Sequence, residues 1–311
     1  MKIIRNLGEI TNKGSVGIGL TIGNFDGVHV GHQVLFKKIN EECLASGLKF
    51  VVITFTPHPI EILTGADNFL INTYWERREL LENMGVDYLC EIDFTRDFST
   101  KSPEEFVEEH ILSSKLLKKI YLGYDFAFGT NKCGTFDIMK KICTSSNISV
   151  ELMDKYQLDS ESISSSVVRN YLSQANLDKV TKFLGRNFFL TGTVVKGAGR
   201  GKKIGHPTAN IMTCGRRLIP PGGVYVTKTY HKNVTYQSIT NIGFNPTFIK
   251  NAKQSTIEVH IFDFDQEIYG EELKVDFIKR LRDEKKFHSA NELIIQIRKD
   301  IMSARNFFAY N

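Results

Sequence analysis

The residues with the clearest chemical potential lie in a glycine-rich turn, GNFDGVHVGH (23–32), between a short apolar run and a helical pattern. The turn carries Asn24, Asp26, His29 and His32. Two histidines three residues apart at a helix entrance project to the same side, and imidazole groups can stabilise negative charge that develops on a phosphate. The N–H groups at a helix start also bind anions. The turn therefore indicates phosphate chemistry, with a metal-binding histidine pair or surface histidines as alternatives.

A second candidate is SISSSVVRNYL (162–172), where Ser164, Ser165 and Ser166 come before an amphipathic helix that carries Arg169. Serine hydroxyls, the N–H groups of a helix start and a guanidinium one turn later suit a second phosphate group. Taken alone, the same pattern also describes an ordinary helix cap.

A third candidate is GTVVKGAGRGKKIGHPTANI (192–211), which combines flexible glycines with basic side chains. A loop that wraps a polyphosphate needs bare backbone and positive charge, although the spacing is not that of a P-loop. Thr208 and Asn210 are two apart on an extended segment, so they point the same way and offer oxygen ligands that suit Mg²⁺. A polar strand edge is the alternative. The basic residues are Lys196, Arg200, Lys202 and Lys203.

The first half of the chain alternates strand-like and helix-like segments, which predicts a doubly wound parallel sheet. Ligands of such sheets bind at the carboxyl ends of the strands, where the turn at 23–32 falls. The expected strands are 17–23, 49–59 and 86–94, and residues 118–129 are expected to form a strand followed by a loop. The expected helices are 32–47, 75–85 and 102–116, the last with a Ser102 cap and Pro103 at its first position.

From about Arg186 the sequence becomes rich in strands with close turn signals, which predicts an antiparallel barrel or sandwich. Residues 289–308 have apolar positions at helical spacing and should form one closing helix. The junction falls within 176–187, where Gly185 is a plausible helix stop. We therefore expect two domains, 1–184 and 185–311.

Bulk composition fits a soluble protein of two domains. The 311 residues are 41% hydrophobic and 24% charged, and no apolar run approaches the length of a membrane span. The N-terminus lacks the pattern of a secretory signal. The cysteines are odd in number, scattered and never in a C-x-x-C pair, which favours reduced thiols in a cytoplasm. They are Cys43, Cys90, Cys133, Cys143 and Cys214.

Charge is unevenly divided between the halves. Residues 1–184 carry 20 Lys and Arg against 24 Asp and Glu, whereas residues 185–311 carry 20 against 11, a net +9. A basic half fits a nucleic acid, a small polyphosphate or only a solvated face.

Together the motifs carry a resemblance. A G-x-F-D-x-x-H-x-G-H loop with a later S-S-S-x-x-R resembles the nucleotidylyltransferase superfamily. TFTPHP (54–59) and YLGYDFAFG (121–129) narrow this to the adenylyltransferase half of the bacterial bifunctional riboflavin kinase/FAD synthetase family. PTAN, NIGFNPTF (241–248) and residues 257–287 are similar to the family's riboflavin kinase domain. The resemblance covers almost the whole chain.

For the first half the resemblance implies a Rossmann-like nucleotidylyltransferase domain, in which the FMN phosphate attacks the α-phosphorus of ATP and expels pyrophosphate. His29 and His32 would stabilise charge on the α-phosphate and leaving group, while Asn24 and Asp26 would shape the loop and its metal. The remaining implied binding residues are Gly23, Gly31, Asp125, Ser164, Ser165 and Arg169, with the last three at the pyrophosphate. The family commonly has a polar residue where this chain has Ala127.

For the second half the resemblance implies a six-stranded antiparallel β-barrel with a C-terminal helix, which transfers the γ-phosphate of ATP to riboflavin. Glu258 would be the catalytic base, and Thr208 and Asn210 would hold Mg²⁺. Arg282 would lie near the flavin or phosphate end. The implied nucleotide loop is Gly197 to Gly201 with Lys202, and its expected glycine contacts are Gly197, Gly199 and Gly201.

The leading hypothesis is thus a two-step enzyme that uses ATP and Mg²⁺ to convert riboflavin to FMN and FMN to FAD. One alternative is a chain with a single working half, more plausibly the kinase. Another is a flavin-sensing RNA-binding regulator, although no RNA-binding motif stands out. We expect small-molecule partners, no membrane and no nucleic acid.

Overall fold

The protein is described here by a computed structural model that covers residues 1–11, 17–197, 199, 201, 204–213, 216–246 and 253–310, with the backbone alone at 244–246 and 253–255. Lys202, predicted to bind nucleotide, lies outside these residues, as do Arg200 and Lys203. The chain divides into two compact units, Met1–Ser165 and Ser166–Asn311, which are treated separately below.

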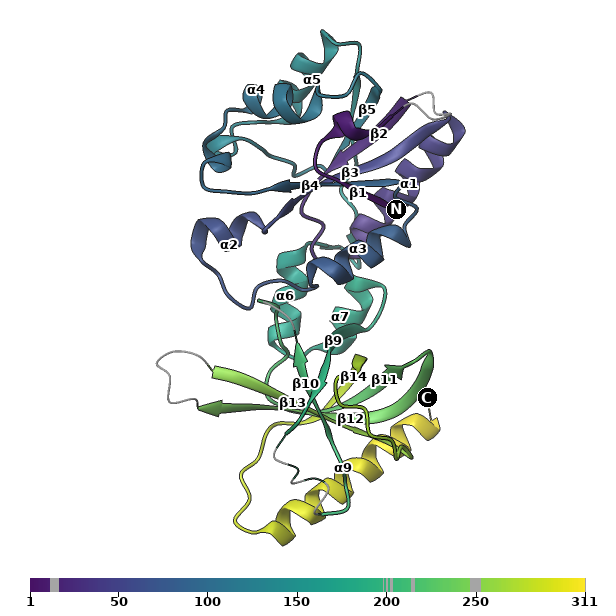
Figure 1. The fold of residues 1–311 in the computed structure, drawn as a ribbon, viewed down its shortest axis with the longest axis vertical. Helices are drawn as coiled ribbons and strands as arrows, with labels where there is room; N and C mark the ends of the chain where they lie inside the picture. The colour runs from purple at the N-terminus through teal and green to yellow at the C-terminus, as the bar shows by residue number, and fades with distance from the viewer. Residues whose placement is uncertain are drawn as a thin grey trace. The chain divides into compact units, whose positions relative to one another are not determined.

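The first unit contains a parallel sheet with the strand order β1-β4-β3-β2-β5-β6 (Figure 1). β2 is buried along its whole length, as expected for a strand covered on both faces. The parallel sheet that the alternating sequence predicted is therefore confirmed. The strands are β1 (Lys2–Ile4), β2 (Gly17–Ile22), β3 (Leu48–Thr56), β4 (Tyr88–Asp93), β5 (Leu117–Leu122) and β6 (Ser149–Leu152).

Helices pack on both faces of this sheet because successive strand side chains alternate. On one face Phe50 and Val52 of β3 pack with α1 (Val30–Ala45) and α3 (Tyr74–Glu82). On the other face their sequence neighbours pack with α4 (Pro103–Phe106), η3 (Val107–Ile111) and α5 (Phe136–Thr144). The shorter elements are η1 (Leu7–Glu9), α2 (Pro59–Thr64), η2 (Phe98–Thr100), η4 (Thr130–Lys132), β7 (Gln157–Leu158) and β8 (Glu161–Ser162).

The helix predicted from Ser102 begins as expected but changes character after one turn. Ser102 accepts the N–H of Glu105, whose carboxylate accepts the N–H of Ser102, and Pro103 opens the helix. The α-helical turn then passes into a π-helical turn that ends at Ile111. The residues that follow lead into β5.

In the described part of the second unit, six antiparallel strands close into a barrel with the order β10-β13-β12-β11-β14-β9 (Figure 1). The sequence predicted a barrel or a sandwich, and the structure is the barrel. Closure removes exposed strand edges. The strands are β9 (Phe188–Val195), β10 (Ala209–Thr213), β11 (Gly223–His231), β12 (Val234–Pro246), β13 (Lys253–Ile261) and β14 (Glu272–Arg282).

Among the described residues, α9 (Ala290–Tyr310) and α7 (Leu177–Leu184) pack against the barrel strands. The predicted closing helix is α9, which packs on β12 and β14. α7 packs on β14 and β9 and ends at Gly185, whose φ of 67° is the left-handed conformation of a glycine helix stop. α6 (Ser165–Ser173) spans the division between the units. The domain boundary at 184/185 remains a prediction.

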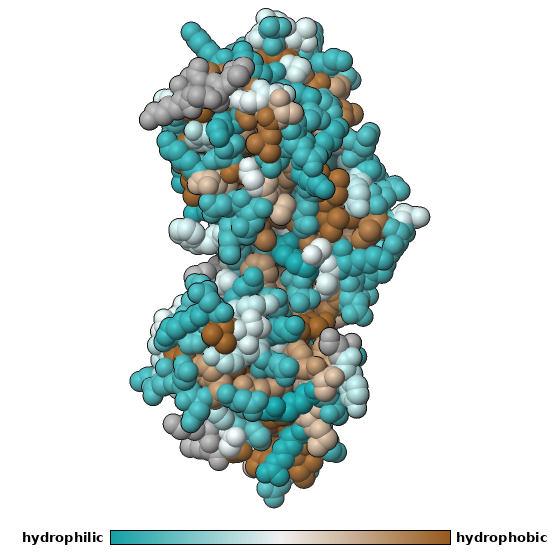
Figure 2. All heavy atoms as spheres, turned by 90° about the vertical axis from the view of Figure 1, so that its right-hand side faces the viewer, coloured by the Kyte–Doolittle hydropathy of each residue, from teal (hydrophilic) through white to brown (hydrophobic). Residues whose placement is uncertain are grey.

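The surface view in Figure 2 shows mostly polar residues, with apolar residues in scattered groups. Among the described helices, none joins the length and the apolar character that crossing a bilayer requires.

Candidate active sites

The turn after β2 adopts a strained backbone. Phe25, Gly27 and Val28 have φ angles of 50°, 81° and 38°. Left-handed conformations of non-glycine residues cost on the order of 1–3 kcal/mol each and persist only where the surroundings enforce them. The turn must therefore be held by contacts from other elements.

Side chains of α3, β3, α6 and α1 donate to carbonyl groups of this turn. The Arg77 guanidinium of α3 and the Thr54 hydroxyl of β3 both donate to the Asn24 carbonyl oxygen, at 3.0 and 3.4 Å. The Ser165 hydroxyl, at the start of α6, donates to the Asp26 carbonyl oxygen at 2.8 Å, and Gln33 of α1 donates to that of Val28 at 2.8 Å. Alternate carbonyls of the turn, those of Asn24, Asp26 and Val28, thus each accept a side-chain hydrogen bond.

The Asp26 side chain is directed into the protein. It is 3% exposed, and its carboxylate accepts the backbone N–H groups of Ile71 at 3.0 Å and Asn72 at 3.2 Å. These contacts join the turn to the segment before α3. They account for the loop-shaping role expected of Asp26, while its role toward a metal stays a prediction.

The two predicted histidines form a pair at the start of α1. Their rings stack with centroids 3.6 Å apart and planes 16° from parallel. The backbone N–H of His32 donates to Nδ1 of His29 at 3.3 Å, so a neutral His29 carries its proton on Nε2. Burial holds the pKa of His32 well below its ordinary value, and the neighbouring His29 lowers it further. His32 is therefore neutral near pH 7.

Two buried polar atoms of the turn fit a polar ligand. Asn24 Oδ1 and His32 Nδ1 make no hydrogen bond within the described part of the chain. Buried polar groups are nearly always paired, so such atoms indicate a functional contact. Both lie on the segment that follows the carboxyl end of β2, where a ligand of this kind of sheet binds.

The other predicted residues of the first half occupy two segments. Ser165 contacts the turn directly, as described above, and Ser164 precedes it, while Arg169 follows one turn later on α6. Asp125 is exposed just beyond the carboxyl end of β5, which pairs with β2. The resemblance had combined the turn and the serine segment in one site, and the Ser165 hydroxyl contacts the turn at the Asp26 carbonyl oxygen.

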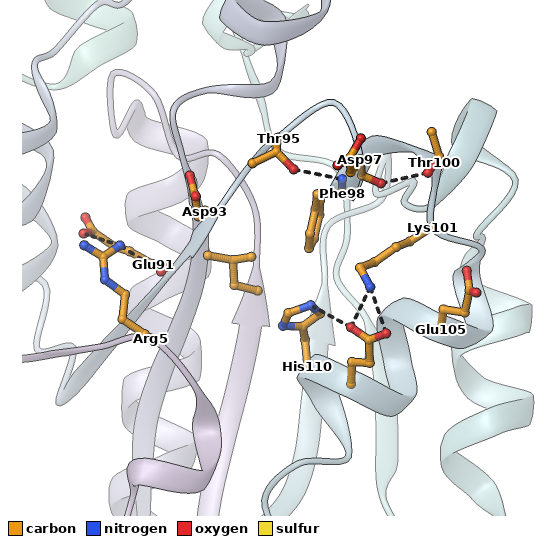
Figure 3. Close-up of a pocket in the computed structure, with 12 residues that line it drawn as sticks. Arg5, Glu91, Asp93, Thr95, Asp97, Phe98, Thr100, Lys101, Glu105 and His110 are labelled. Carbon is orange, nitrogen blue, oxygen red and sulfur yellow. Dashed lines mark hydrogen bonds and ion pairs between the residues drawn. The ribbon is translucent and has the colours of Figure 1, made fainter.

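A cleft of about 780 Å³ lies elsewhere in the first unit, beside the end of β4 (Figure 3). Its lining includes none of the predicted site residues. Five of its side chains are carboxylates and only Arg5 and Lys101 are basic, with Lys101 paired to Glu109 at 2.7 Å. Such a surface repels phosphates, so it does not suit ATP or FMN. The carboxylates are Glu91, Asp93, Asp97, Glu105 and Glu109.

In the second unit, strand register places the predicted kinase residues side by side. Asn210 of β10 is directly opposite Glu258 of β13, which is directly opposite Asn241 of β12. Directly opposite residues share a face and have Cβ atoms about 5 Å apart. Ile257 and Val259 are buried on the other face, so the row formed by Asn210, Glu258 and Asn241 lies on the outside of the barrel. An amide and a carboxylate thus meet at one point.

The glycine-rich turn lies against the predicted metal ligands. A Cβ atom on Gly197 would be 2.1 Å from Asn210 Nδ2, and one on Gly201 would be 3.2 Å from Thr208 Oγ1. Thr208 and Asn210 therefore both face this turn. Gly199 has a φ of 66°, which favours glycine.

One neighbour of this row was not singled out from the sequence. His260, two residues after Glu258 on β13, donates from Nδ1 to the Pro207 carbonyl oxygen at 2.8 Å. It therefore fixes the residue just before Thr208. Its signal was the two-residue spacing from Glu258, which places both side chains on one face of a strand.

Arg282 forms an ion pair with the closing helix. Its guanidinium donates to both carboxylate oxygens of Asp300, at 2.7–3.0 Å, and Asp300 is 5% exposed. Gln296 donates to the same carboxylate at 2.8 Å. The contact ties the end of β14 to α9, and the expected role of Arg282 near the flavin or phosphate stays a prediction.

Comparison with known proteins assigns a family to each half of the chain. The sequence model of the FAD synthetase family matches residues 12–167, and that of riboflavin kinase matches residues 184–308. A Bacillus subtilis protein named bifunctional riboflavin kinase/FMN adenylyltransferase is 34% identical over 300 residues, which cover 93% of this chain and 92% of the relative. The Escherichia coli K12 protein of that name is 32% identical and covers 99% of this chain and 98% of its own.

A solved structure has the same fold. A Streptococcus pneumoniae crystal structure, named as a macrolide-efflux protein, is 32% identical with a TM-score of 0.86 over 98% of both chains. The resemblance drawn from the motifs is confirmed by the two family matches and the full-length relatives. The chain therefore belongs to the family of bifunctional riboflavin kinase/FMN adenylyltransferases.

Proposed function

We propose that the chain makes FMN and then FAD by dividing the two reactions between its halves. Residues 185–311 transfer the γ-phosphate of ATP to riboflavin, and residues 1–184 transfer AMP from a second ATP to FMN. The observation that supports the proposal is that each unit holds one pair of adjacent predicted residues. These are the stacked His29–His32 pair and the Asn210–Glu258 register pair.

In the kinase reaction Glu258 acts as the general base. Its carboxylate accepts the proton of the ribityl 5′-hydroxyl as that oxygen attacks the γ-phosphorus and ADP leaves. The outer face of β13 gives this carboxylate access to substrate, and the adjacent glycine turn lets the phosphates approach the backbone.

Thr208 and Asn210 fit a magnesium site because both face the glycine turn and both offer side-chain oxygens. Bound Mg²⁺ supplies neutralisation of the charge on the transferring phosphate. His260 holds the carbonyl of Pro207 and so keeps Thr208 in place.

In the adenylyl transfer an oxygen of the FMN phosphate attacks the α-phosphorus of ATP, and pyrophosphate leaves. The phosphate is already anionic, so no protein nucleophile is needed. Neutral imidazole still carries one N–H, and His29 and His32 donate to the oxygens on which charge develops. The hydroxyl of Ser164 and the guanidinium of Arg169 hold the leaving pyrophosphate.

The proposed setting is the cytoplasm, with ATP, riboflavin and FMN as small-molecule partners. Cys43, Cys90 and Cys143 are buried free thiols, and burial raises the pKa of each, so these cysteines are inert packing residues. Nucleic acid is not expected as a partner.

The test is to incubate the pure protein with riboflavin, ATP and Mg²⁺ and to separate the flavins over time. FMN should appear first and convert to FAD. Glu258→Gln should abolish FMN formation but still convert supplied FMN to FAD, and His32→Ala should do the reverse. Glu267→Gln and His110→Ala are the matched controls, since Glu267 is exposed and His110 lies in the acidic cleft.

The outcomes separate the hypotheses. If FMN accumulates and no FAD forms, even when FMN is supplied, the second half is an active kinase and the first half is inactive. Absence of any product would refute the enzyme assignment. Chelation of Mg²⁺ with EDTA should stop FMN formation, and retention of that activity would refute the role given to Thr208 and Asn210.

A further inference from the structure

A buried arginine outside the predicted site links the ends of three strands. Arg77 of α3 is 2% exposed. Its guanidinium donates to the Asn24 carbonyl oxygen at 3.0 Å, to the Thr56 hydroxyl at 3.0 Å and to the Phe55 carbonyl oxygen at 3.4 Å. It also lies 3.8 Å from the carboxylate of Glu91. These acceptors lie at or just beyond the ends of β2 and β3, and on β4.

Stability alone gives little reason for this arrangement. Burial of a guanidinium carries a desolvation penalty, which here lowers the pKa of Arg77, and a buried ion pair can often be replaced by apolar residues without loss of stability. One of its nitrogens, Nε, has no hydrogen-bond partner among the described residues. A charge kept in such a place indicates a requirement for the groups that it orients.

The most consequential of these groups is the carbonyl of Asn24. It immediately precedes Phe25, whose φ is 50°, so the peptide that Arg77 fixes leads into the strained part of the turn. The Phe25 ring then contacts the ring of His32 edge to face, with centroids 5.1 Å apart. A continuous chain of contacts therefore runs from Arg77 through Asn24 and Phe25 to His32.

We propose that Arg77 is a positioning residue for adenylyl transfer. By holding the Asn24 carbonyl, it keeps the turn in its strained conformation and sets the places of the Asn24 side chain and the His32 ring. It touches neither substrate, and it acts through the turn. The inference rests on the proposed assignment of the 23–32 turn to adenylyl transfer.

The neighbouring arginine provides a matched control. Arg78 also binds Glu91, through two hydrogen bonds of 2.9 and 2.6 Å. Its guanidinium also lies over the exposed ring of Trp75, and among the described residues it forms no hydrogen bond or ion pair with the 23–32 turn. Loss of Arg78 therefore removes a link to Glu91 but spares the turn.

The experiment measures kcat and KM for FAD formation from FMN in Arg77→Met, Arg77→Lys and Arg78→Met, and FMN formation in the same samples. Arg77→Met should lower kcat for FAD formation about 100-fold, the effect of a misplacement near 1 Å, with KM for FMN changed by no more than about threefold. Arg77→Lys should recover part of kcat because an ammonium can reach one of the acceptors. FMN formation should be unchanged in all three variants.

Equal loss of FAD formation in Arg77→Met and Arg78→Met would overturn the inference, because the effect would then pass through Glu91. An unchanged kcat for FAD formation in Arg77→Met would also overturn the inference. A change in KM for FMN without a change in kcat would do the same. If Arg77→Met also loses kinase activity through misfolding, Thr56→Val removes one anchor of the guanidinium, and a kcat equal to that of the parent protein would refute the proposal. His32→Ala in the same assay tests the assignment of the 23–32 turn separately from the role of Arg77. Retained FAD formation in His32→Ala would refute the assignment of the turn itself.

Discussion

Substitution of Gly197 by alanine should silence the kinase half through one steric contact. The new Cβ would lie 2.1 Å from Asn210 Nδ2, whereas ordinary van der Waals contact begins at 3.4 Å. The amide or the glycine turn must therefore move by about 1.3 Å, the difference between these two distances. A misplacement near 1 Å in an active site lowers the rate about 100-fold, so we expect a loss of that size in FMN formation.

The assay is FMN formation from riboflavin, with FAD formation from supplied FMN measured in the same sample. Because Gly197 lies in the second unit, FAD formation should remain at the level of the parent protein. Gly270→Ala is the control, since a Cβ there meets no atom within 4 Å although its φ is 81°, so it tests backbone strain without the clash. Kinase activity within threefold of the parent in Gly197→Ala would refute the placement of Asn210 against the turn.

Two further predictions concern stability. Asp300→Ala leaves the Arg282 guanidinium without its carboxylate partner. Because the ion pair is largely buried, this loss should lower the free energy of unfolding of the second unit by about 3 kcal/mol, measured by urea denaturation. A change below about 1 kcal/mol would contradict the burial of the pair. His32, with its pKa lowered in the folded state, contributes stability that is complete above about pH 6.5 and is lost at lower pH, because the unfolded chain takes up the proton first. Urea denaturation between pH 7.5 and pH 5.5 should show a decline that is shallower in His32→Gln by up to about 1.4 kcal/mol per pH unit, and parallel curves would contradict it.

The sequence predicted the elements well because their signals are local. The buried strand that contains Val51 and Val52 is apolar without alternation, as a parallel strand covered on both faces should be, and the structure buries both residues. The histidine spacing predicted two rings on one side of a helix start, and the rings are stacked.

The partners of buried charges were less accessible from sequence. Arg77 lies 53 residues from Asn24, and Arg282 lies 18 residues from Asp300. Nothing in a single sequence specifies which carbonyl or carboxylate a guanidinium will meet, because the fold brings them together. A signal did exist for Arg77: it lies four residues before the buried Leu81, on the apolar side of a helix where a charge is out of place.

The closed barrel has a consequence for the accuracy of the kinase site. Asn210, Glu258 and Asn241 belong to three neighbouring strands, and a slip of one residue between any two would turn Glu258 inward and bring Ile257 or Val259 outward. In an open sheet an edge strand can change its register alone, because it pairs with one neighbour. In a closed barrel every strand pairs with two neighbours, so a change of register at one strand pair must be compensated at the other strand pairs. Barrel closure thus fixes the register of the strands, and the spacing between Glu258 and Asn210 persists as long as the barrel stays folded.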